Sequence, residues 1–401
     1  MSFSRLLLLA ALIASAVASV PARAQGLRAA VEAAWARSAA GRAQPARTDE
    51  AAAKRDAARA WFPESPSVSL AHRNDALTGN RGAREYEAGV SVPVPWPATR
   101  SSAAGVADAE ATRTDARGIE LKWRLAGEVR EAYWQWRASV AERRLAERKV
   151  TDARRLADDV DRRVRLGEVR SLDLAQARAV EAQARVALAE ADAKLFRARR
   201  VFELLTGMAP PADATETERA DAPATDAHPR IRALKVAVEV GNARLRQARS
   251  SGWGAPEMGV GMRRERESRD ERRDTSLMFQ LRVPFPNTAR ERAQTATAGA
   301  DLVEAEAELA VERERVAAEI AAGREELAQA RAAVGYAQTR RRLSVEAHAL
   351  TVRAYAAGEI DLATRLRIEA ERFEAELGAD RAAIEAARAV ARLNQARGVV
   401  P

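Results

Sequence analysis

The chain has 401 residues, with 66 Lys and Arg, 57 Asp and Glu, 3 His and no Cys, and a formal net charge of +9. The absence of cysteine excludes disulfides, thiolate metal sites and cysteine nucleophiles. Aromatic residues make up 4% of the chain and charged residues 31%, a composition that suits long solvated helices better than the compact core of an enzyme. A basic chain can bind nucleic acid, but the first residues predict export.

Residues 1–24 have the three parts of a secretory signal peptide. Arg5 supplies the positive charge, Leu6 to Ala18 form an apolar stretch, and Ala22 to Ala24 place small residues at the positions that signal peptidase reads. The apolar stretch is shorter than the roughly 20 residues that span a bilayer, which disfavours a membrane anchor. We therefore expect cleavage before Gln25. No later apolar run approaches spanning length, so a membrane association of the mature chain would use strands.

The mature sequence contains an internal repeat with an offset close to 191 residues. The VPVP segment at 92–95 matches VPFP at 283–286, and Gly-Glu-Val at 167–169 matches Gly-Glu-Ile at 358–360. Each match is weak alone, but several landmarks at nearly one offset indicate a duplicated unit.

The repeat predicts two units, 25–210 and 228–401, joined by a Pro/Ala/Asp/Thr-rich connector at 211–227. Each unit is expected to contain, in order, a helix, a hairpin of two strands, a very long helix, a glycine-centred turn and a second long helix. The very long helices are expected at about 100–166 and 290–357, where proline is absent. At 1.5 Å per residue, each would be a rod of about 100 Å.

Alternation of apolar and polar residues predicts the strands. Every even position from Tyr86 to Val94 is apolar, as is every odd position from Leu277 to Phe285, a period of two that only a strand explains. Their partner strands contain Val68 and Leu70 in the first hairpin and Met258, Val260 and Met262 in the second. A polar loop is expected at 74–82 and a charged one at 263–274. Four strands are too few to close a membrane barrel, so membrane insertion would require several chains.

No motif in the sequence carries catalysis or metal binding. His72, His228 and His348 lack ligand spacing and are expected at the surface. The glycine-rich stretch 252–261 lacks the Lys-Ser/Thr of a phosphate loop. Tyr133, Trp134 and Trp136 lie on an apolar helix seam and are expected to pack there. We therefore predict a protein that is not an enzyme, without catalytic, cofactor-binding or metal-binding residues.

A signal peptide, two such units and a VPxP strand end followed by arginine resemble the TolC-type outer-membrane efflux factors, over essentially the whole mature chain. The two helix turns, RLGEVRSLDL at 165–174 and YAAGEIDL at 355–362, look like the periplasmic tips of that family. The short connector and the length near 400 are most similar to its heavy-metal, CzcC-like branch. The prolines at the two strand-to-helix junctions are Pro93, Pro95, Pro284 and Pro286.

The resemblance implies a mainly α protein with a small β part. Three chains, each giving four strands, would close a twelve-stranded β-barrel in the outer membrane of a Gram-negative-type cell, and their helices would form a coiled-coil α-barrel in the periplasm. The homotrimer would be a passive exit duct for metal cations or small toxic compounds. Its partners would be outer-membrane lipid, a periplasmic adaptor (membrane fusion) protein and an inner-membrane pump, with no nucleic acid.

The resemblance also assigns roles to residues at the turns. The adaptor-docking surface would consist of Leu166, Gly167, Glu168, Val169, Gly358, Glu359 and Ile360. Acidic residues that narrow the pore would be Asp173 and, as a looser counterpart, Asp361. Because the second unit has Thr364 where the first has Asp173, the gate could instead pair Asp173 with Arg365 or Arg367. Ordinary surface charges on a helix remain an equal alternative for these four residues.

Three other functions stay open at this point. An outer-membrane duct of a type I protein secretion system would differ only in its inner-membrane partner. A periplasmic coiled-coil scaffold or chaperone would have no use for two alternating hairpins. A basic nucleic-acid binder fits the net charge, but it conflicts with the signal peptide and with the acidic residues mixed through the same helices.

Overall fold

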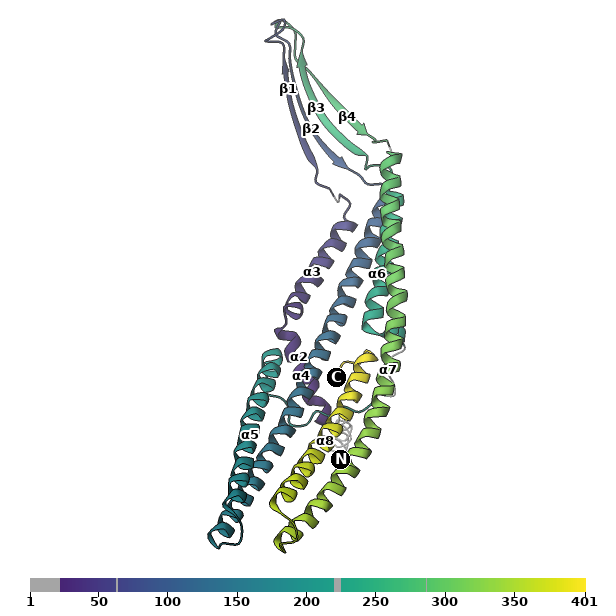
Figure 1. The fold of residues 1–401 in the computed structure, drawn as a ribbon. Coiled ribbons are helices and arrows are strands. Elements are labelled where there is room, and N and C mark those ends of the chain that lie inside the picture. Colours follow the sequence, from purple (N-terminus) through teal and green to yellow (C-terminus); the bar gives the residue numbers. More distant parts are fainter. Residues whose placement is uncertain (1–21, 63, 220–224, 286) are drawn as a thin grey trace, which may run out of the picture. The chain divides into compact units, whose positions relative to one another are not determined.

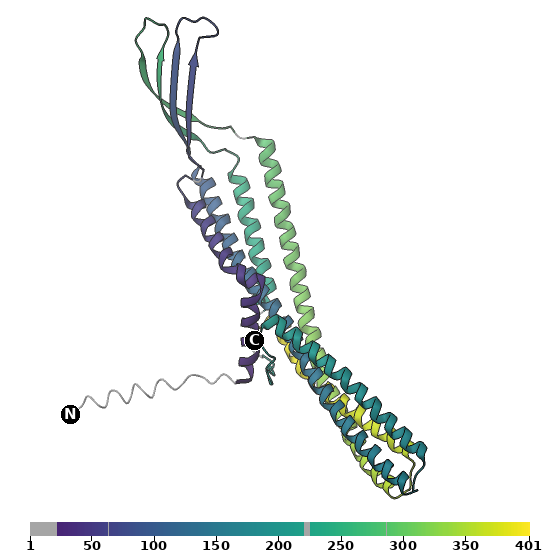
Figure 2. The same ribbon diagram turned by 90° about the vertical axis from the view of Figure 1, so that its left-hand side faces the viewer.

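The computed structural model describes residues 22–62, 64–219, 225–285 and 287–401. They form long helices and one four-stranded sheet (Figures 1 and 2). The predicted signal peptide falls almost wholly on residues 1–21, which lie outside the described residues, as does Pro286. The mainly α fold class with a small β part is confirmed.

The first helical segment of the first repeat is divided in two. Helix α2 (Ala22–Arg37) is followed after one residue by α3 (Ala39–Arg59). At the break, the hydroxyl of Ser38 accepts a hydrogen bond from the backbone N–H of Gly41 at 2.9 Å. A serine side chain that accepts from the N–H three residues later caps the start of a new helix. The structure therefore has two helices where the sequence predicted one. The second repeat has one helix in this position, α6 (Pro229–Ser250).

The long helices of the two repeats match in length and spacing. Helices α4 (Pro97–Arg165) and α7 (Thr288–Ala356) have 69 residues each, and they begin 191 positions apart. Each continues through a short turn into a second helix, α5 (Ser171–Thr206) or α8 (Leu362–Ala396). The predicted bounds were within three residues of these ends, because proline stops each helix on one side and glycine on the other.

The sheet is a meander of four antiparallel strands in the order β1-β2-β3-β4. The strands are β1 (Ser67–Asn74), β2 (Arg84–Pro93), β3 (Glu257–Arg266) and β4 (Asp274–Arg282). Strand β2 pairs with β3 along its whole length, from Arg84 opposite Arg266 to Pro93 opposite Glu257. The predicted loop at 263–274 was wrong at its start, because Arg263 to Arg266 pair with β2 and extend the strand.

The chain divides into two compact units that cut across the repeats. One comprises residues 43–120 and 229–314, which include the whole sheet, and the other comprises residues up to 42, 121–228 and 315–401. We call them the strand unit and the turn unit. Each unit therefore takes half of both repeats. In the strand unit, β2 of the first repeat pairs with β3 of the second repeat.

The turn unit has a core of aromatic and small residues. Tyr133 is fully buried and Trp134 is 4% exposed, and both pack with Phe202 and Leu27. The hydroxyl of Tyr133 accepts a hydrogen bond from the backbone N–H of Ala214 at 2.8 Å. The prediction that these aromatic residues pack along the helix seam is confirmed, and the Ala214 contact ties the connector to α4.

A buried ion pair fastens the connector further. The Arg130 guanidinium donates to both carboxylate oxygens of Glu216, at 2.7 and 2.9 Å, and to the carbonyl of Val399 at 2.9 Å. The two side chains are only 4% and 10% exposed. Asn394 also donates to Glu216, at 3.1 Å. The start of the connector and the C-terminal residues are therefore held on one arginine of α4.

Among the described residues, no helix combines the length and the apolar character needed to cross a membrane.

Candidate functional site

Two surfaces of the chain are candidate functional sites: the pair of helix turns in the turn unit and the sheet in the strand unit. Each turn is built on a glycine with positive φ, 76° at Gly167 and 77° at Gly358. After Gly167, Glu168 N–H donates to the carbonyl of Arg163, and Glu359 N–H donates to that of Ala354, both at 2.9 Å. This is the Schellman arrangement, in which glycine takes the left-handed position. It reverses the chain direction in few residues.

The two turns pack against each other through apolar side chains. Val169 and Leu174 of the first turn and Ile360 of the second are partly buried against a cluster formed by Leu156, Ala157, Val160, Ala177, Tyr355 and Leu362. Figure 2 shows the α4–α5 and α7–α8 turns at the same end of the turn unit. Val169 and Ile360 therefore hold the turns together, and they contribute less to an outer surface than the prediction assumed.

Among the described residues, the large exposed apolar side chains at the turns belong to the first repeat. Leu166 is 74% exposed and Leu172 is 56% exposed. At the matching positions of the second repeat stand Ala357 and Ala363. Leu172 was missed in the sequence, although a leucine directly after the serine that begins a helix, on the side away from the seam, is the signal that could have found it.

Each acidic gate candidate caps a helix. Asp173 accepts a hydrogen bond from the backbone N–H of Arg170 at 3.2 Å, and Asp361 accepts one from the N–H of Thr364 at 2.9 Å. Hydrogen bonds from the Thr364 side chain and backbone hold the pKa of Asp361 below its usual value. The two carboxylates therefore satisfy helix N-termini, where negative charge is favoured.

The basic gate candidates have partners of their own. Arg367 pairs with Glu371 at 3.1 Å, and the guanidinium of Arg365 lies over the ring of Tyr355, 4.8 Å from its centroid. Asp173 is 3.5 Å from Arg170. Within the described part of one chain, the pairing of Asp173 with Arg365 or Arg367 is therefore not formed.

Behind the turns lies a cluster of charged residues between α4 and α8. Arg372 pairs with Asp152 at 2.7 Å and lies 3.5 Å from Glu376. Glu369 is 8% exposed, and burial raises its pKa, while Arg365 and Arg372 act to lower it. The pKa of His348 is lowered mainly by burial and further by the positive charges of Arg372 and Arg365.

The sheet has two faces of opposite character. On one face lie Val68, Leu70, Val90, Met258, Val260, Met262, Leu277, Phe279 and Leu281, which are 49% to 82% exposed. On the other face, Arg263 pairs with Glu85 at 2.7 Å and with Glu265 at 2.8 Å, and Ser67 bonds to Ser91 at 2.7 Å. A row of large, exposed apolar side chains over four strands needs an apolar environment that one chain does not supply.

Tryptophans mark the end of the sheet that joins the helices. Trp61 is 75% exposed, Trp96 39% and Trp253 50%. The Arg100 guanidinium lies over the Trp61 ring at 4.6 Å, and the Trp96 indole donates to the carbonyl of Gly254 at 3.2 Å. Pro93 ends β2, Pro95 lies between β2 and α4, and Pro284 lies between β4 and α7. The prolines thus lie where the hydrogen bonding between strands ends, because proline has no N–H to donate to a neighbouring strand.

The three histidines lie on different parts of the chain. His72 is exposed in β1, His348 is half-buried in α7, and His228 is 1% exposed, with its ring 4.9 Å from Trp123. The expectation of a surface position was wrong for His228. In the described part of the chain, no group of three His, Asp or Glu side chains is placed to hold a metal ion.

Comparison with solved structures identifies the fold. The fold matches that of VceC, an outer membrane protein of Vibrio cholerae, with a TM-score of 0.75 and 15% identity over 93% of this chain and 96% of that one. For the CmeC outer membrane channel of Campylobacter jejuni, the TM-score is 0.75 and the identity 14%, over 93% of this chain and 85% of that one. For the open state of the MtrE outer membrane channel of Neisseria gonorrhoeae, the TM-score is 0.73 and the identity 17%, over 93% of this chain and 89% of that one. The chain has the fold of outer-membrane channels.

A family model matches part of the chain. Residues 20–208 are similar to the outer membrane efflux protein family. Among curated proteins, none matches the chain.

Proposed function

We propose that this chain is the outer-membrane channel subunit of a tripartite efflux system, a passive exit duct that extends into the periplasm and spends no energy of its own. The observation that carries the proposal is the exposed apolar face of the sheet in a chain with this fold. It requires a lipid environment and further strands at both edges, because β1 and β4 each have one unpaired side.

The dimensions of the sheet support membrane insertion. Trp96, near the helices, follows ten positions after Tyr86, near the loops. At roughly 3.3 Å per residue, this stretch of β2 and the extended residues after it covers about 33 Å, or about 23 to 27 Å across a membrane at a tilt of 35 to 45°. Membrane barrels have an apolar band of about 25 Å between aromatic girdles. Three chains would give a closed barrel of twelve strands.

We propose further that the turns dock a periplasmic adaptor protein. Leu166, Gly167 and Glu168 of the first turn and Gly358 and Glu359 of the second are exposed, and Leu172 adds a second exposed apolar side chain. Val169 and Ile360 support this surface from beneath. An adaptor linked to an inner-membrane pump would bury the two leucines.

Insertion is tested with one matched pair of variants. Phe279 is on the apolar face, 82% exposed, and Gln280 is its exposed neighbour on the polar face. In Phe279→Arg the charge meets lipid, at a cost of roughly 2 to 4 kcal/mol near the membrane centre. In Gln280→Arg it meets water. We expect wild type and Gln280→Arg to fractionate with outer membranes as heat-modifiable trimers, and Phe279→Arg to be depleted there. A soluble monomeric wild type would instead favour the periplasmic scaffold.

Docking is tested by cross-linking, for which the absence of native cysteine is an advantage. Leu166→Cys should cross-link to the adaptor protein of the same efflux system, whereas Val186→Cys, 54% exposed in the middle of α5, should not. Equal cross-linking at both positions would count against a docking surface at the turn.

The substrate class needs a separate experiment. We propose metal cations or small toxic compounds, with the heavy-metal, CzcC-like branch as the more specific form. A deletion strain that gains sensitivity to divalent metals alone supports that branch, and sensitivity to organic compounds supports the wider class. Loss of a secreted protein with neither sensitivity would instead support a type I secretion duct.

The gate proposal involves Asp173, Asp361, Arg365 and Arg367. Single-channel conductance in planar bilayers would be compared for wild type, Asp173→Ala and Arg367→Ala. Leakage through the closed state should rise in at least one variant if these charges narrow the pore. Unchanged leakage in both would leave the two residues as a helix cap and a surface ion pair.

A further inference from the structure

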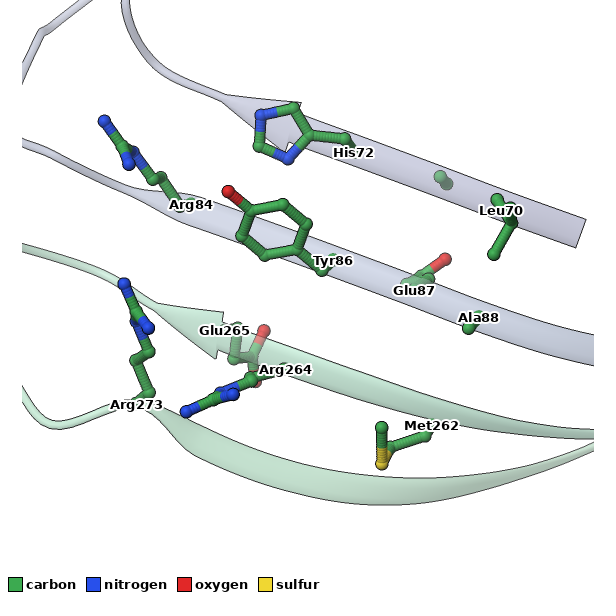
Figure 3. A pocket seen from close by; sticks show the side chains of 11 residues that line it. Leu70, His72, Arg84, Tyr86, Glu87, Ala88, Met262, Arg264, Glu265 and Arg273 are labelled. Carbon is green, nitrogen blue, oxygen red and sulfur yellow. The ribbon is translucent and has the colours of Figure 1, made fainter.

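An open pocket of about 570 Å³ lies on the apolar face of the sheet, at its loop end (Figure 3). Its floor is formed by apolar side chains that include Leu70, Ala88 and Met262. Toward the loops, the pocket is lined by Arg84, Arg264 and Arg273. The pocket thus combines an apolar and a cationic part on one face.

Strand register makes the change from apolar to cationic abrupt. Leu70, Ala88, Met262 and Leu277 stand in one row across the four strands. The next row on the same face has His72, Tyr86 and Arg264, and Arg84 begins the row after. Successive rows on one face are about 7 Å apart. Within two rows, the surface therefore passes from one suited to acyl chains to one suited to anions.

The rings of His72 and Tyr86 form the boundary between the two parts. They stack with centroids 4.4 Å apart. Aromatic rings with a polar edge are typical of the interface between lipid tails and head groups. This row therefore stands at the level where a lipid head group begins.

The arginines of this pocket form no ion pair in the described part of the chain. Glu87 and Glu265 also line the pocket, but they belong to the opposite side of their strands, and neither is paired with Arg84, Arg264 or Arg273. On that opposite side the arginines are paired. Arg73 lies 3.5 Å from Glu85, and Arg263 lies 2.7 Å from the same carboxylate. Within the described strands, the unpaired guanidinium groups therefore lie on the apolar face, where an anion would approach from the lipid side.

We propose that this pocket binds a phosphorylated lipid of the outer leaflet, with its phosphate between Arg84, Arg264 and Arg273 and an acyl chain along Leu70, Ala88 and Met262. Guanidinium groups match phosphate geometry with paired N–H donors. The apolar floor selects a phosphate that carries acyl chains over one that is free in solution. The proposal rests on the membrane placement proposed above.

The test measures binding of fluorescent diphosphoryl lipid A to the purified full chain in nonionic detergent micelles at 0.15 M salt. The comparison ligand has the same acyl chains and no phosphate. The test variant is Arg84→Gln/Arg264→Gln, and the control is Arg73→Gln/Arg282→Gln, which removes the same charge from the other face of the same sheet. Circular dichroism and gel mobility establish that both variants fold and assemble.

We expect the wild type to prefer the phosphorylated lipid. One basic residue beside an anionic lipid is worth roughly a fivefold change in affinity, so the test variant should bind it about 25-fold more weakly. The control should stay within about twofold of wild type. Inorganic phosphate at 10 mM should displace little lipid. Equal weakening in both variants, no preference for the phosphorylated lipid, or full displacement by inorganic phosphate would overturn the proposal.

Failure here is distinguishable from failure of the proposed function. A trimeric outer-membrane protein that binds both lipids equally refutes only the lipid site. A wild-type chain that never reaches the outer membrane refutes the channel itself.

Discussion

Asp173 and Asp361 cap equivalent helices from positions that are not equivalent. Asp173 is the third residue of α5, and its carboxylate accepts from Arg170, the residue before the helix. Asp361 is itself the residue before α8, and it accepts from Thr364. At the repeat offset, Asp361 corresponds to Arg170 and Thr364 to Asp173. The missing acid at 364 is therefore replaced by an acid at the other end of the same capping contact.

The Asp361 cap gives a prediction about acid stability. Because hydrogen bonds lower the pKa of Asp361 from its ordinary value of 3.8, its contribution to stability is present above that value and is lost as pH falls through the lowered pKa. Asp361→Ala should lower the thermal midpoint at pH 7, with a smaller difference from wild type at the lowest pH. Asp361→Asn keeps the cap without the charge and should lie between them. Thermal unfolding followed by circular dichroism measures this, and an Asp361→Ala midpoint equal to wild type at pH 7 would contradict it.

The turn glycines should be costly to replace for conformational reasons alone. An added Cβ at Gly167 or Gly358 would meet no atom within 4 Å, but both residues have positive φ. Gly167→Ala and Gly358→Ala should each lower the free energy of unfolding by about 1 kcal/mol. Gly335 has equally open space within helix α7, so Gly335→Ala should raise it by about 0.5 to 1 kcal/mol. Denaturant titrations give the three values, and losses of similar size at all three positions would refute the explanation.

The ion pair of Arg130 and Glu216 should be hard to break from one side. Arg130→Ala leaves the carboxylate of Glu216 buried without its guanidinium partner, which costs roughly 3 to 5 kcal/mol. The double variant Arg130→Met/Glu216→Leu removes both charges and should recover most of that loss. Thermal unfolding of the two variants tests the coupling. If the double variant is no more stable than Arg130→Ala, the pair does not act as a unit.

His348 should make the turn unit sensitive to mild acid. Its pKa lies below the ordinary 6.5 because of burial and the nearby positive charges of Arg372 and Arg365, with Asp152 acting in the opposite direction. The folded state then binds this proton less readily than the unfolded one, so stability is complete above pH 6.5 and falls as pH decreases below it.

The matched variant is His348→Gln, which cannot take up the proton. Burial raises the pKa of Glu369 nearby, which stabilises the folded state as pH falls, and this opposing effect is the same in both proteins. The thermal midpoint of wild type should therefore drop relative to His348→Gln between pH 7.5 and pH 5. Parallel midpoints over this range would show that His348 is not the titrating group.

The long helices and the hairpins could be predicted because each has a local cause. A stretch without proline ended by glycine delimits α4 and α7, and strict alternation marks β2 and β4. The extension of β3 to Arg266 could not be predicted in this way, since its four charged residues form a strand through pairing with β2. Burial of His228 depends on Trp123, more than a hundred residues away. Tertiary contacts decide what local propensity leaves open.

At the turns, the sequence predicted which residues are involved but not which way they face. Val169 and Ile360 were assigned to an outer surface, and both pack against the Tyr355 cluster. Leu172 was not assigned, and it is exposed. Whether a side chain at a turn is buried or exposed depends on how the two helical hairpins pack together. Residue spacing within one hairpin does not reveal that packing.

Because the second repeat has alanine where the first has leucine, the two kinds of turn would bind a partner protein with different strength. A ring of three chains would present six turns, in which a turn bearing Leu166 and Leu172 alternates with one bearing Ala357 and Ala363. If the turns dock adaptor subunits as proposed above, identical adaptors would meet two kinds of binding position with different affinities. The leucine-bearing positions would fill first and empty last, so assembly would pass through a half-occupied complex.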